Sequence, residues 1–592
     1  MSEPSRPPQI TVLDAGGQYC HLIARKVREL GVYAEVRRSE TPAPELAGRR
    51  GLIISGGPSS VYEPGSPTVD PAIFGDGHGV LGICYGLQLM AHALGGQVRK
   101  GDKGEFGMAT LEIRAADPLF AGLDTRQQIW MSHRDLVAAV PAGFSVLATT
   151  ATCPVAAMSE PGRKLYAVQF HPEVNHTRQG KEILRNFLFS ICGCERDWDP
   201  SHRIPLIEEE IRQTVGDRSV FFFVSGGVDS TVAYTLCLRA LGPGRVRGVY
   251  VDTGLMREGE TGFVARMFDS LGAGALTVER AADRFLAALD EVRDPERKRH
   301  LIGEEFVQVQ ERIIESLGLL DGHWLLGQGT IYPDTIESGG GERAATIKTH
   351  HNRVAGIERL IQAKRIVEPI RSLYKDEVRE VGRELGLPEE LLERHPFPGP
   401  GLAIRCLCSS EEAPVVRTPD GFLLPVHSVG VQGDSRSYAP VLALDRFPAA
   451  GSGLHDHATE LINRLSGVNR VVALVEAKAP LPALRTRPCA LSADRLDRLR
   501  RADSIVRRVC HESGFERQVW QFPVVLIPTG SESHPDSVVL RPIDSVDGMT
   551  AQSVPMDSGL LRALAAELLQ VPGVCAVFYD LTHKPPATIE WE

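Results

Sequence analysis

The sequence lacks the features that mark membrane, secreted and nucleic-acid-binding proteins. No apolar run approaches the roughly 20 residues that a bilayer-spanning helix needs, and residues 1–8 lack a signal peptide's apolar stretch, so we expect a frayed terminus there. The 65 Lys and Arg are scattered and outnumbered by 75 Asp and Glu, for a net charge of −10, whereas polyanionic partners normally meet a basic stripe. We therefore expect no membrane and no nucleic acid among the partners, while small anionic substrates stay allowed.

The 11 cysteines also lack a pattern. None shows the tandem C-x2-C spacing of a zinc site, and the pairs Cys192/Cys194 and Cys406/Cys408 are isolated. An unsecreted chain with unpatterned cysteines is typical of the cytoplasm, where thiols stay reduced. We therefore expect a cytoplasmic protein with no zinc. We also expect no tightly bound organic cofactor.

The chain does contain a succession of α/β patterns. At 592 residues it is too long for one hydrophobic core, so we expect several domains. Over residues 9–194, short β-branched strands alternate with helices, which predicts an α/β domain with a largely parallel sheet. Residues 195–205 are polar and contain two prolines, as expected of a linker. A second, doubly wound α/β domain is predicted over 206–400, and an α+β part over 401–592.

The segment GICYG, residues 82–86, follows an apolar strand and opens a helix. Its glycine spacing is that of a nucleophile elbow, with Cys84 where a serine would stand. A thiol at a helix N-terminus feels the positive end of the helix dipole, which favours the thiolate. Taken alone, a buried cysteine is structural in most proteins, so Cys84 needs a partner to be a candidate nucleophile.

That partner is predicted in QFHPE, residues 169–173, just after an apolar strand. His171 can take the thiol proton and Glu173 can orient the imidazole. Backbone N–H groups of Gly56 and Gly57, after the strand GLIIS, are candidates for part of an oxyanion hole.

The strings SGGPSSVYE, GICYGLQLMA, MSHRD and QFHPE together resemble the class I glutamine amidotransferases. In that family the matching Cys, His and Glu form the catalytic triad. The resemblance implies that Gln88 and the segment from His133 to Asp135 hold the glutamine substrate.

A second candidate site lies in VSGGVDST, residues 224–231, between a very apolar strand and a helix. Glycines and hydroxyls before a helix N-terminus suit a phosphate, but the Walker A lysine is missing. The string resembles the loop of the ATP pyrophosphatases, which release pyrophosphate as they adenylate an oxygen. The residues expected to bind ATP are Ser225, Gly226, Gly227, Val228, Asp229, Ser230 and Thr231, with Asp252 at the next strand end facing the nucleoside. Asp229 is also a tentative ligand for the Mg²⁺ that accompanies ATP.

That loop alone is compatible with NAD, asparagine and argininosuccinate synthetases and with tRNA thiolation enzymes. Two later segments help to choose among these enzyme classes. IKTHHN follows a glycine-rich stretch and is a candidate lid, in which Lys348, His350 and His351 suit developing negative charge. The end of the chain, KPPATIEWE, is stiffened by prolines and carries a tryptophan, so we expect it to be docked, with Lys584 and Thr588 suited to a phosphate.

With HPFPGPGLAIR and GVQGDSRSY, these segments make the chain from about residue 9 to 592 resemble the glutamine-hydrolysing GMP synthases. The resemblance implies that XMP, ATP and glutamine are the substrates, and that an adenyl-XMP intermediate takes up the ammonia released from glutamine to give GMP. The implied XMP contacts are Arg299, Asp434, Gln521, Lys584 and Glu590.

The sequence departs from compact family members by an insertion over about 444–537. Because the C-terminal domain mediates dimerisation in compact members, the insertion leaves both a monomer and a homodimer open. Two other function classes also stay open: a tRNA-modifying enzyme, which would want a basic groove, and a non-catalytic protein that retains an enzyme fold.

Overall fold

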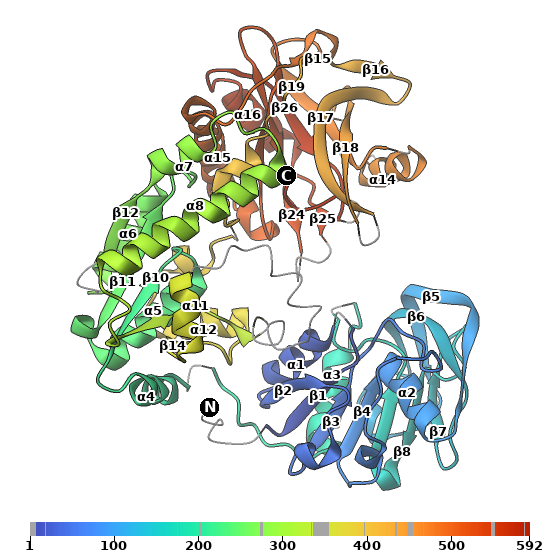
Figure 1. The fold of residues 1–592 in the computed structure, drawn as a ribbon. Helices are drawn as coiled ribbons and strands as arrows, with labels where there is room; N and C mark the ends of the chain where they lie inside the picture. The colour runs from blue at the N-terminus through green and yellow to red at the C-terminus, as the bar shows by residue number, and fades with distance from the viewer. Residues whose placement is uncertain are drawn as a thin grey trace. The chain divides into compact units, whose positions relative to one another are not determined.

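The computed structural model describes residues 8–17, 19–174, 176–200, 203–272, 276–332, 334, 355–395, 397–432, 435–447, 454–465, 467–545, 551–584 and 587–592. These residues form two compact units, Met1–Arg203 and Ile204–Glu592 (Figure 1). The multidomain α/β class predicted from the sequence is confirmed. Among the described residues, no helix is long and apolar enough to cross a membrane.

The first unit is built on one nine-stranded sheet in the order β2-β1-β3-β4-β9-β8-β7-β5-β6. Its strands are β1 (Ile10–Asp14), β2 (Ala34–Arg38), β3 (Gly51–Ile54), β4 (Gly79–Ile83), β5 (Gln97–Ile113), β6 (Arg126–Ala139), β7 (Ser145–Thr149), β8 (Ala157–Glu160) and β9 (Leu165–Val168). Its helices are α1 (Cys20–Glu29), α2 (Tyr85–Ala93) and α3 (Gly180–Arg185). Helix α1 packs on β1 and β2, and α2 on β3, β4 and β9.

Only half of this sheet is parallel, so the expectation of a largely parallel sheet is wrong. Strands β2, β1, β3, β4 and β9 pair in parallel, whereas β8, β7, β5 and β6 extend the sheet in antiparallel pairs. The long β5–β6 ribbon is rich in polar residues and glycine, and this weakens the apolar run by which a buried strand is recognised.

The first residues of the predicted linker pack onto the first unit. The Trp198 ring stacks on Tyr33 with centroids 4.7 Å apart, and the Arg28 guanidinium lies 4.6 Å from the Trp198 ring. The backbone N–H of Tyr33 donates to Asp197 Oδ1 at 2.9 Å. Residues 197–198 are therefore held by stacking and hydrogen bonding.

The second unit begins with a parallel five-stranded sheet in the order β12-β11-β10-β13-β14. Its strands are β10 (Ser219–Phe223), β11 (Val246–Asp252), β12 (Leu276–Arg280), β13 (Trp324–Gly327) and β14 (Ile366–Val367). The helices around it are α4 (Ile204–Val215), α5 (Val228–Leu241), α6 (Glu260–Ser270), α7 (Ala282–Ala288), α8 (Pro295–Ser316), α11 (Ala355–Gln362), α12 (Lys375–Glu384) and α13 (Glu389–Leu392).

The rest of the unit is mixed α+β, centred on a seven-stranded sheet in the order β16-β17-β18-β19-β26-β23-β21. Those strands are β16 (Val416–Thr418), β17 (Gly421–Gln432), β18 (Ser435–Leu444), β19 (Arg470–Ala477), β21 (Val524–Ile527), β23 (Asp536–Leu540) and β26 (Val574–Asp580). Shorter strands are β15 (Ala413–Pro414), β20 (Arg485–Thr486), β22 (Thr529–Gly530), β24 (Ile543–Asp544) and β25 (Gln552–Ser553), and the helices are α14 (Leu454–Arg464), α15 (Ala493–Ser513) and α16 (Ser558–Leu568).

One hydrophobic core joins the two parts of this second unit. It includes Phe285 and Val309 from the five-stranded part and Leu499 and Val506 from α15, all buried. Arg500 of α15 also donates to the backbone oxygens of Met256 and Gly254. The boundary expected near residue 400 thus lies inside a single compact unit.

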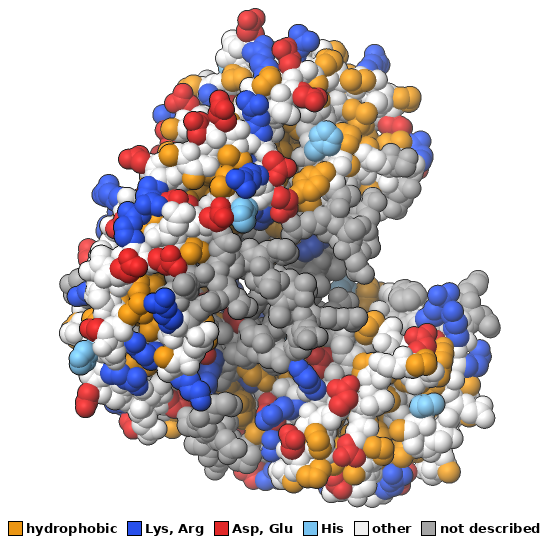
Figure 2. Space-filling model, viewed as in Figure 1, with side chains coloured by type: hydrophobic (Ala, Val, Ile, Leu, Met, Phe, Trp, Pro, Cys, Tyr) orange, Lys and Arg blue, Asp and Glu red, His pale blue; other side chains and the backbone are white. Residues whose placement is uncertain are grey.

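Charges of both signs are interleaved over the surface seen in Figure 2, where blue and red side chains alternate. This distribution agrees with the scattered basic residues of the sequence.

Candidate functional site

Cys84 occupies a sharp turn between β4 and α2. Its backbone has φ 54° and ψ −104°, in the positive-φ region that non-glycine residues rarely adopt. The flanking glycines make the turn sterically feasible, since a Cβ on Gly82 would lie 2.5 Å from the Gly86 oxygen and one on Gly86 would lie 2.4 Å from the Ile54 oxygen. The strand and helix thus hold the thiol at a strained elbow, a position in which nucleophiles are often found.

His171 and Glu173 lie beside this elbow, beyond the end of β9. His171 Nδ1 is 2.7 Å from Glu173 Oε1, and both side chains are buried. Burial alone would lower the pKa of His171, but the Glu173 carboxylate and the Cys84 sulfur raise it well above its ordinary value. The order sulfur, imidazole, carboxylate is the one that nucleophilic acyl transfer needs.

Gly56 lies against both Cys84 and His171. A Cβ built on it would be 3.2 Å from His171 Cε1 and 3.6 Å from Cys84 Cβ. Gly57 packs as closely on the other side, where its Cβ would meet the Ala15 oxygen at 2.5 Å. The backbone after β3 is therefore close enough to the thiol for its N–H groups to face a reacting carbonyl.

The residues expected to hold glutamine form a hydrogen-bonded group next to Cys84. Gln88 Nε2 donates to the Asp135 backbone oxygen at 2.8 Å, and His133 Nδ1 lies 2.9 Å from the same oxygen. Gln169 links the group to Cys84, because its amide contacts Gln88 at 3.3 Å and the Cys84 sulfur at 3.6 Å. Gln88, His133 and Asp135 are all buried.

The loop from Ser225 to Thr231 forms a compact turn before α5. Ser225 Oγ and Ser230 Oγ are 3.1 Å apart, and the N–H of Gly227 donates to Ser225 Oγ at 3.2 Å. Gly226 has φ +74°, a conformation that glycine adopts readily. Gly329, after β13, approaches the same loop, because its Cβ would lie 2.8 Å from the Ser230 nitrogen. Such a crowded glycine turn at a helix N-terminus suits phosphate binding.

Two carboxylates flank this loop. Asp229 Oδ2 is 2.5 Å from Lys375 Nζ, while its Oδ1 is buried without a hydrogen-bond partner among the described residues. Asp252, at the end of β11, accepts from the Gly254 N–H at 3.0 Å and from the Thr261 hydroxyl at 2.9 Å. Asp252 also lines a cavity of about 430 Å³ that Arg501 of α15 borders.

The end of the chain is docked, as its sequence predicts. Trp591 is fully buried, and the Glu592 backbone oxygen and carboxylate accept from Arg299 and from Lys298 respectively. Glu590 accepts from Arg405 in a bidentate pair, at 2.9 and 2.7 Å.

Five residues are expected to contact XMP, and four of them lie among the described residues. Arg299 and Glu590 are paired within the protein as above, and the backbones of Gln521 and Lys584 bridge to Ile543 and Ala551. Asp434 lies outside the described residues, as do Lys348, His350 and His351 of the expected lid.

Sequence reasoning missed several side chains that the structure places at these sites. Gln169 belongs to the QFHPE string but was assigned no role, although it touches the Cys84 sulfur. Lys375 lies 146 positions from Asp229, and Arg405 lies 185 positions from Glu590. Nothing in a single sequence signals pairs so far apart.

Two family models match parts of this chain, and relatives match almost all of it. Residues 11–191 match the family described as "Glutamine amidotransferase class-I", and residues 508–591 match "GMP synthase C terminal domain". A Leptospira interrogans protein named as a probable GMP synthase (glutamine-hydrolyzing) is 42% identical over 99% of this chain and 99% of its own. The GMP synthase (glutamine-hydrolyzing) of Caldicellulosiruptor saccharolyticus is 40% identical over 98% of this chain and 99% of its own. A solved structure from Thermoplasma acidophilum, described as one subunit of a GMP synthase, is 35% identical, covering 31% of this chain and 92% of its own with a TM-score of 0.28.

Proposed function

The chain belongs to the glutamine-hydrolysing GMP synthases, and we propose that its two compact units divide that reaction between them. In this proposal the first unit releases ammonia from glutamine, and the second activates XMP with ATP and receives the ammonia. The observation that carries the proposal is the order of sulfur, imidazole and carboxylate at the elbow of the first unit.

In the first unit, Cys84 attacks the side-chain amide carbon of glutamine as a thiolate. The raised pKa of His171 favours an imidazolium, which gives its proton to the leaving nitrogen and so releases ammonia. Glu173 stabilises that imidazolium, and N–H groups at Gly56 and Gly57 face the oxyanion. Water, deprotonated by the now neutral His171, then hydrolyses the glutamyl thioester to glutamate and restores the Cys84 thiolate beside the His171 imidazolium.

In the second unit, the C2 oxygen of XMP attacks the α-phosphorus of ATP, forming adenyl-XMP and pyrophosphate. The turn from Ser225 to Thr231 holds the leaving pyrophosphate on backbone N–H groups and hydroxyls. Ammonia then attacks C2 and displaces AMP, which yields GMP. Arg299, Asp434, Gln521, Lys584 and Glu590 contact XMP in this proposal.

Asp229 fits a magnesium ligand, because its Oδ1 is a buried carboxylate oxygen without a partner among the described residues. Mg²⁺ bound there would neutralise charge on the phosphates of ATP. Lys375, now paired with Asp229, supplies a second positive group beside the loop. In this proposal Lys348, His350 and His351 belong to a lid over the reacting groups. The enzyme acts in the cytoplasm, as a monomer or a homodimer.

A single substitution separates the two half-reactions. We expect Cys84→Ala to abolish GMP formation from glutamine while leaving formation from ammonium nearly unchanged, because ammonium bypasses the thiol. Product formation with XMP, ATP and Mg²⁺ is measured with each nitrogen source, and Cys489→Ser, far from the elbow in sequence, serves as the matched control. Loss of both activities in Cys84→Ala would contradict the division of labour.

A further inference from the structure

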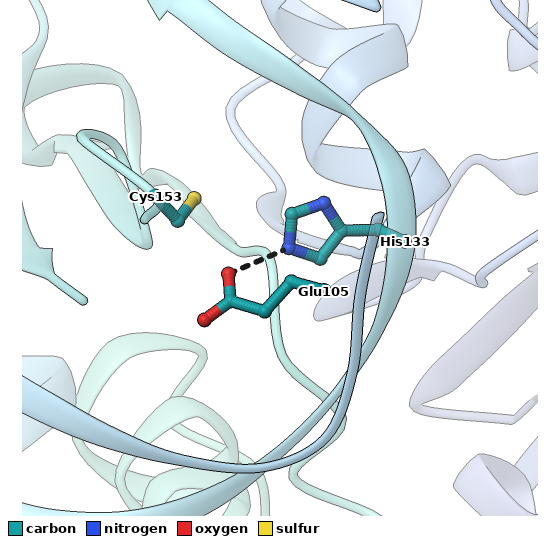
Figure 3. Close-up of side chains that lie close together, drawn as sticks. All are labelled: Glu105, His133 and Cys153. Atoms are coloured by element: carbon teal, nitrogen blue, oxygen red, sulfur yellow. Dashed lines mark hydrogen bonds and ion pairs between the residues drawn. The ribbon is translucent and has the colours of Figure 1, made fainter. Parts of the chain in front are cut away.

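Three potential metal ligands converge in the first unit, apart from the triad. Glu105 lies on β5, His133 on the neighbouring strand β6, and Cys153 on the loop between β7 and β8. One donor atom from each lies within 4.8 Å of the other two. Figure 3 shows the three side chains directed toward one another, with a line joining Glu105 to His133.

The hydrogen bonding of His133 leaves one ring nitrogen directed at this cluster. Nδ1 is 2.9 Å from the Asp135 backbone oxygen, which can only accept, so Nδ1 carries a hydrogen. Nε2 therefore faces Glu105 Oε2, at 3.3 Å, with either a proton or a lone pair. Metal-binding histidines typically donate their other N–H to a backbone carbonyl in this way, which fixes the ring orientation.

Thr150 connects the other two members. Its hydroxyl lies 3.1 Å from Glu105 Oε1, and it accepts from the backbone N–H of Cys153 at 3.0 Å. Cys153 is fully buried, with its thiol 3.4 Å from the Val155 oxygen.

We propose that Glu105, His133 and Cys153 form a binding site for one zinc ion. Thiolate, imidazole and carboxylate are the three ligand types that Zn²⁺ accepts, and three protein ligands leave a fourth position open. Adjacent ligands in a tetrahedral zinc site lie roughly 3.5 Å apart, so the donor atoms must close by about 1 Å. On binding, Cys153 releases its thiol proton to solvent, and the thiolate and carboxylate together balance the charge of the ion.

The soft sulfur ligand selects the kind of cation. Mg²⁺ prefers oxygen ligands, so the magnesium of the synthesis reaction does not compete for a site that contains a thiolate. Sequence reasoning excluded zinc because it searched for tandem C-x2-C spacing. These ligands instead come from three segments that only the antiparallel half of the sheet brings together.

Zinc at this position would also be linked to the glutamine site. The Asp135 oxygen that accepts from His133 also accepts from Gln88, and Ser132, which precedes His133, accepts from the Cys84 thiol at 3.6 Å. A metal that holds His133 therefore holds the segment against which the nucleophile rests. Zinc binding itself does not rest on the function proposed above.

The test measures zinc binding to the full chain in a Cys84→Ala background, which removes the competing thiol of the elbow. A competing chelator gives the zinc affinity, and Co²⁺ substitution reports a thiolate ligand through its sulfur-to-metal charge-transfer band. We expect one equivalent to bind with that band present. Adding Cys153→Ser should abolish the band and weaken binding more than about a hundredfold, beyond the 10–100-fold typical of outer-shell changes.

Two further variants keep the test decisive. Glu105→Gln retains the shape of the side chain but not its charge, so it should weaken zinc binding at least about tenfold while keeping the cobalt band. Cys489→Ser, which removes a cysteine outside the first unit, should change neither. The proposal is wrong if the Cys84→Ala protein shows no thiolate band with Co²⁺, or if neither Cys153→Ser nor Glu105→Gln weakens zinc binding.

Discussion

The charge of Asp580 should hold the end of the chain in place. Asp580 is fully buried, and its Oδ2 lies 2.6 Å from Arg470 Nη1, 2.9 Å from Arg541 Nη1 and 3.0 Å from Trp591 Nε1. Arg541 in turn donates to the Ile589 oxygen at 2.9 Å. Asp580→Asn keeps the volume of the side chain but leaves two buried guanidinium groups without their shared counter-charge.

The expected cost follows from that burial. Both arginines are fully buried, and removing one partner of a buried ion pair typically costs about 3–5 kcal/mol. We expect Asp580→Asn to lower the free energy of unfolding of the second unit by that amount. Since the same guanidinium groups hold the tail, the KM for XMP should also rise at least about tenfold in the ammonium-driven reaction.

The stability effect should depend on pH with a defined sign. Burial raises the pKa of Asp580, but Arg541 and Arg470 outweigh it and hold that pKa below its ordinary value of about 3.9. The stabilisation is therefore fully present above the unfolded pKa and is lost as pH falls from about 4 through the lower folded value. The difference between wild type and Asp580→Asn should shrink over that acidic range.

Urea unfolding followed by tryptophan fluorescence, together with ammonium-driven kinetics, measures both effects. Asp536→Asn is the matched control, because Asp536 is also a buried carboxylate shared by two arginines, Arg495 and Arg498. It should cost comparable stability while leaving the KM for XMP within about twofold. A loss below about 1 kcal/mol in Asp580→Asn, or equal KM changes in both variants, would refute the reasoning.

Three further outcomes are expected. Glu173→Gln should lower glutamine-driven synthesis about 10²–10⁴-fold, since the imidazole loses the carboxylate that orients and charges it, and a matching loss with ammonium would contradict this. Gly86→Ala should lower the melting temperature or prevent folding, because its Cβ would lie 2.4 Å from a backbone oxygen, whereas Gly75→Ala, with its nearest contact at 3.6 Å, should be tolerated. Lys375→Met should slow synthesis from both nitrogen sources, as measured by pyrophosphate release, because it removes a cation beside Asp229; an effect confined to glutamine would place Lys375 elsewhere in the mechanism.

Much of the fold was predictable where strands are buried on both faces. The apolar runs now seen as β3, β4, β9, β10 and β11 indicated strands directly, because parallel strands between helices bury most of their side chains. The β5–β6 ribbon escaped because charged residues and glycines interrupt its apolar positions. For that reason the sequence did not predict the antiparallel half of the first sheet.

The candidate sites divide in a similar way. Strings such as GICYG, QFHPE and SGGVDS were readable because a tight turn at a strand end needs particular residues next to one another in sequence. Gln169 stood in such a string, yet its contact with the Cys84 sulfur depends on how β4 and β9 pair.

The sequence by itself determined the elbow at Cys84, the glycine turn at Ser225 and the docked end of the chain, because each depends on local backbone geometry and burial. Only the tertiary structure decided which distant polar side chains meet: Lys375 with Asp229, Arg405 with Glu590, and Glu105 with His133. The physical reason is that these side chains meet in space, and the order of the strands and the packing of the helices bring them together. Neither can be deduced from residue spacing along a single sequence.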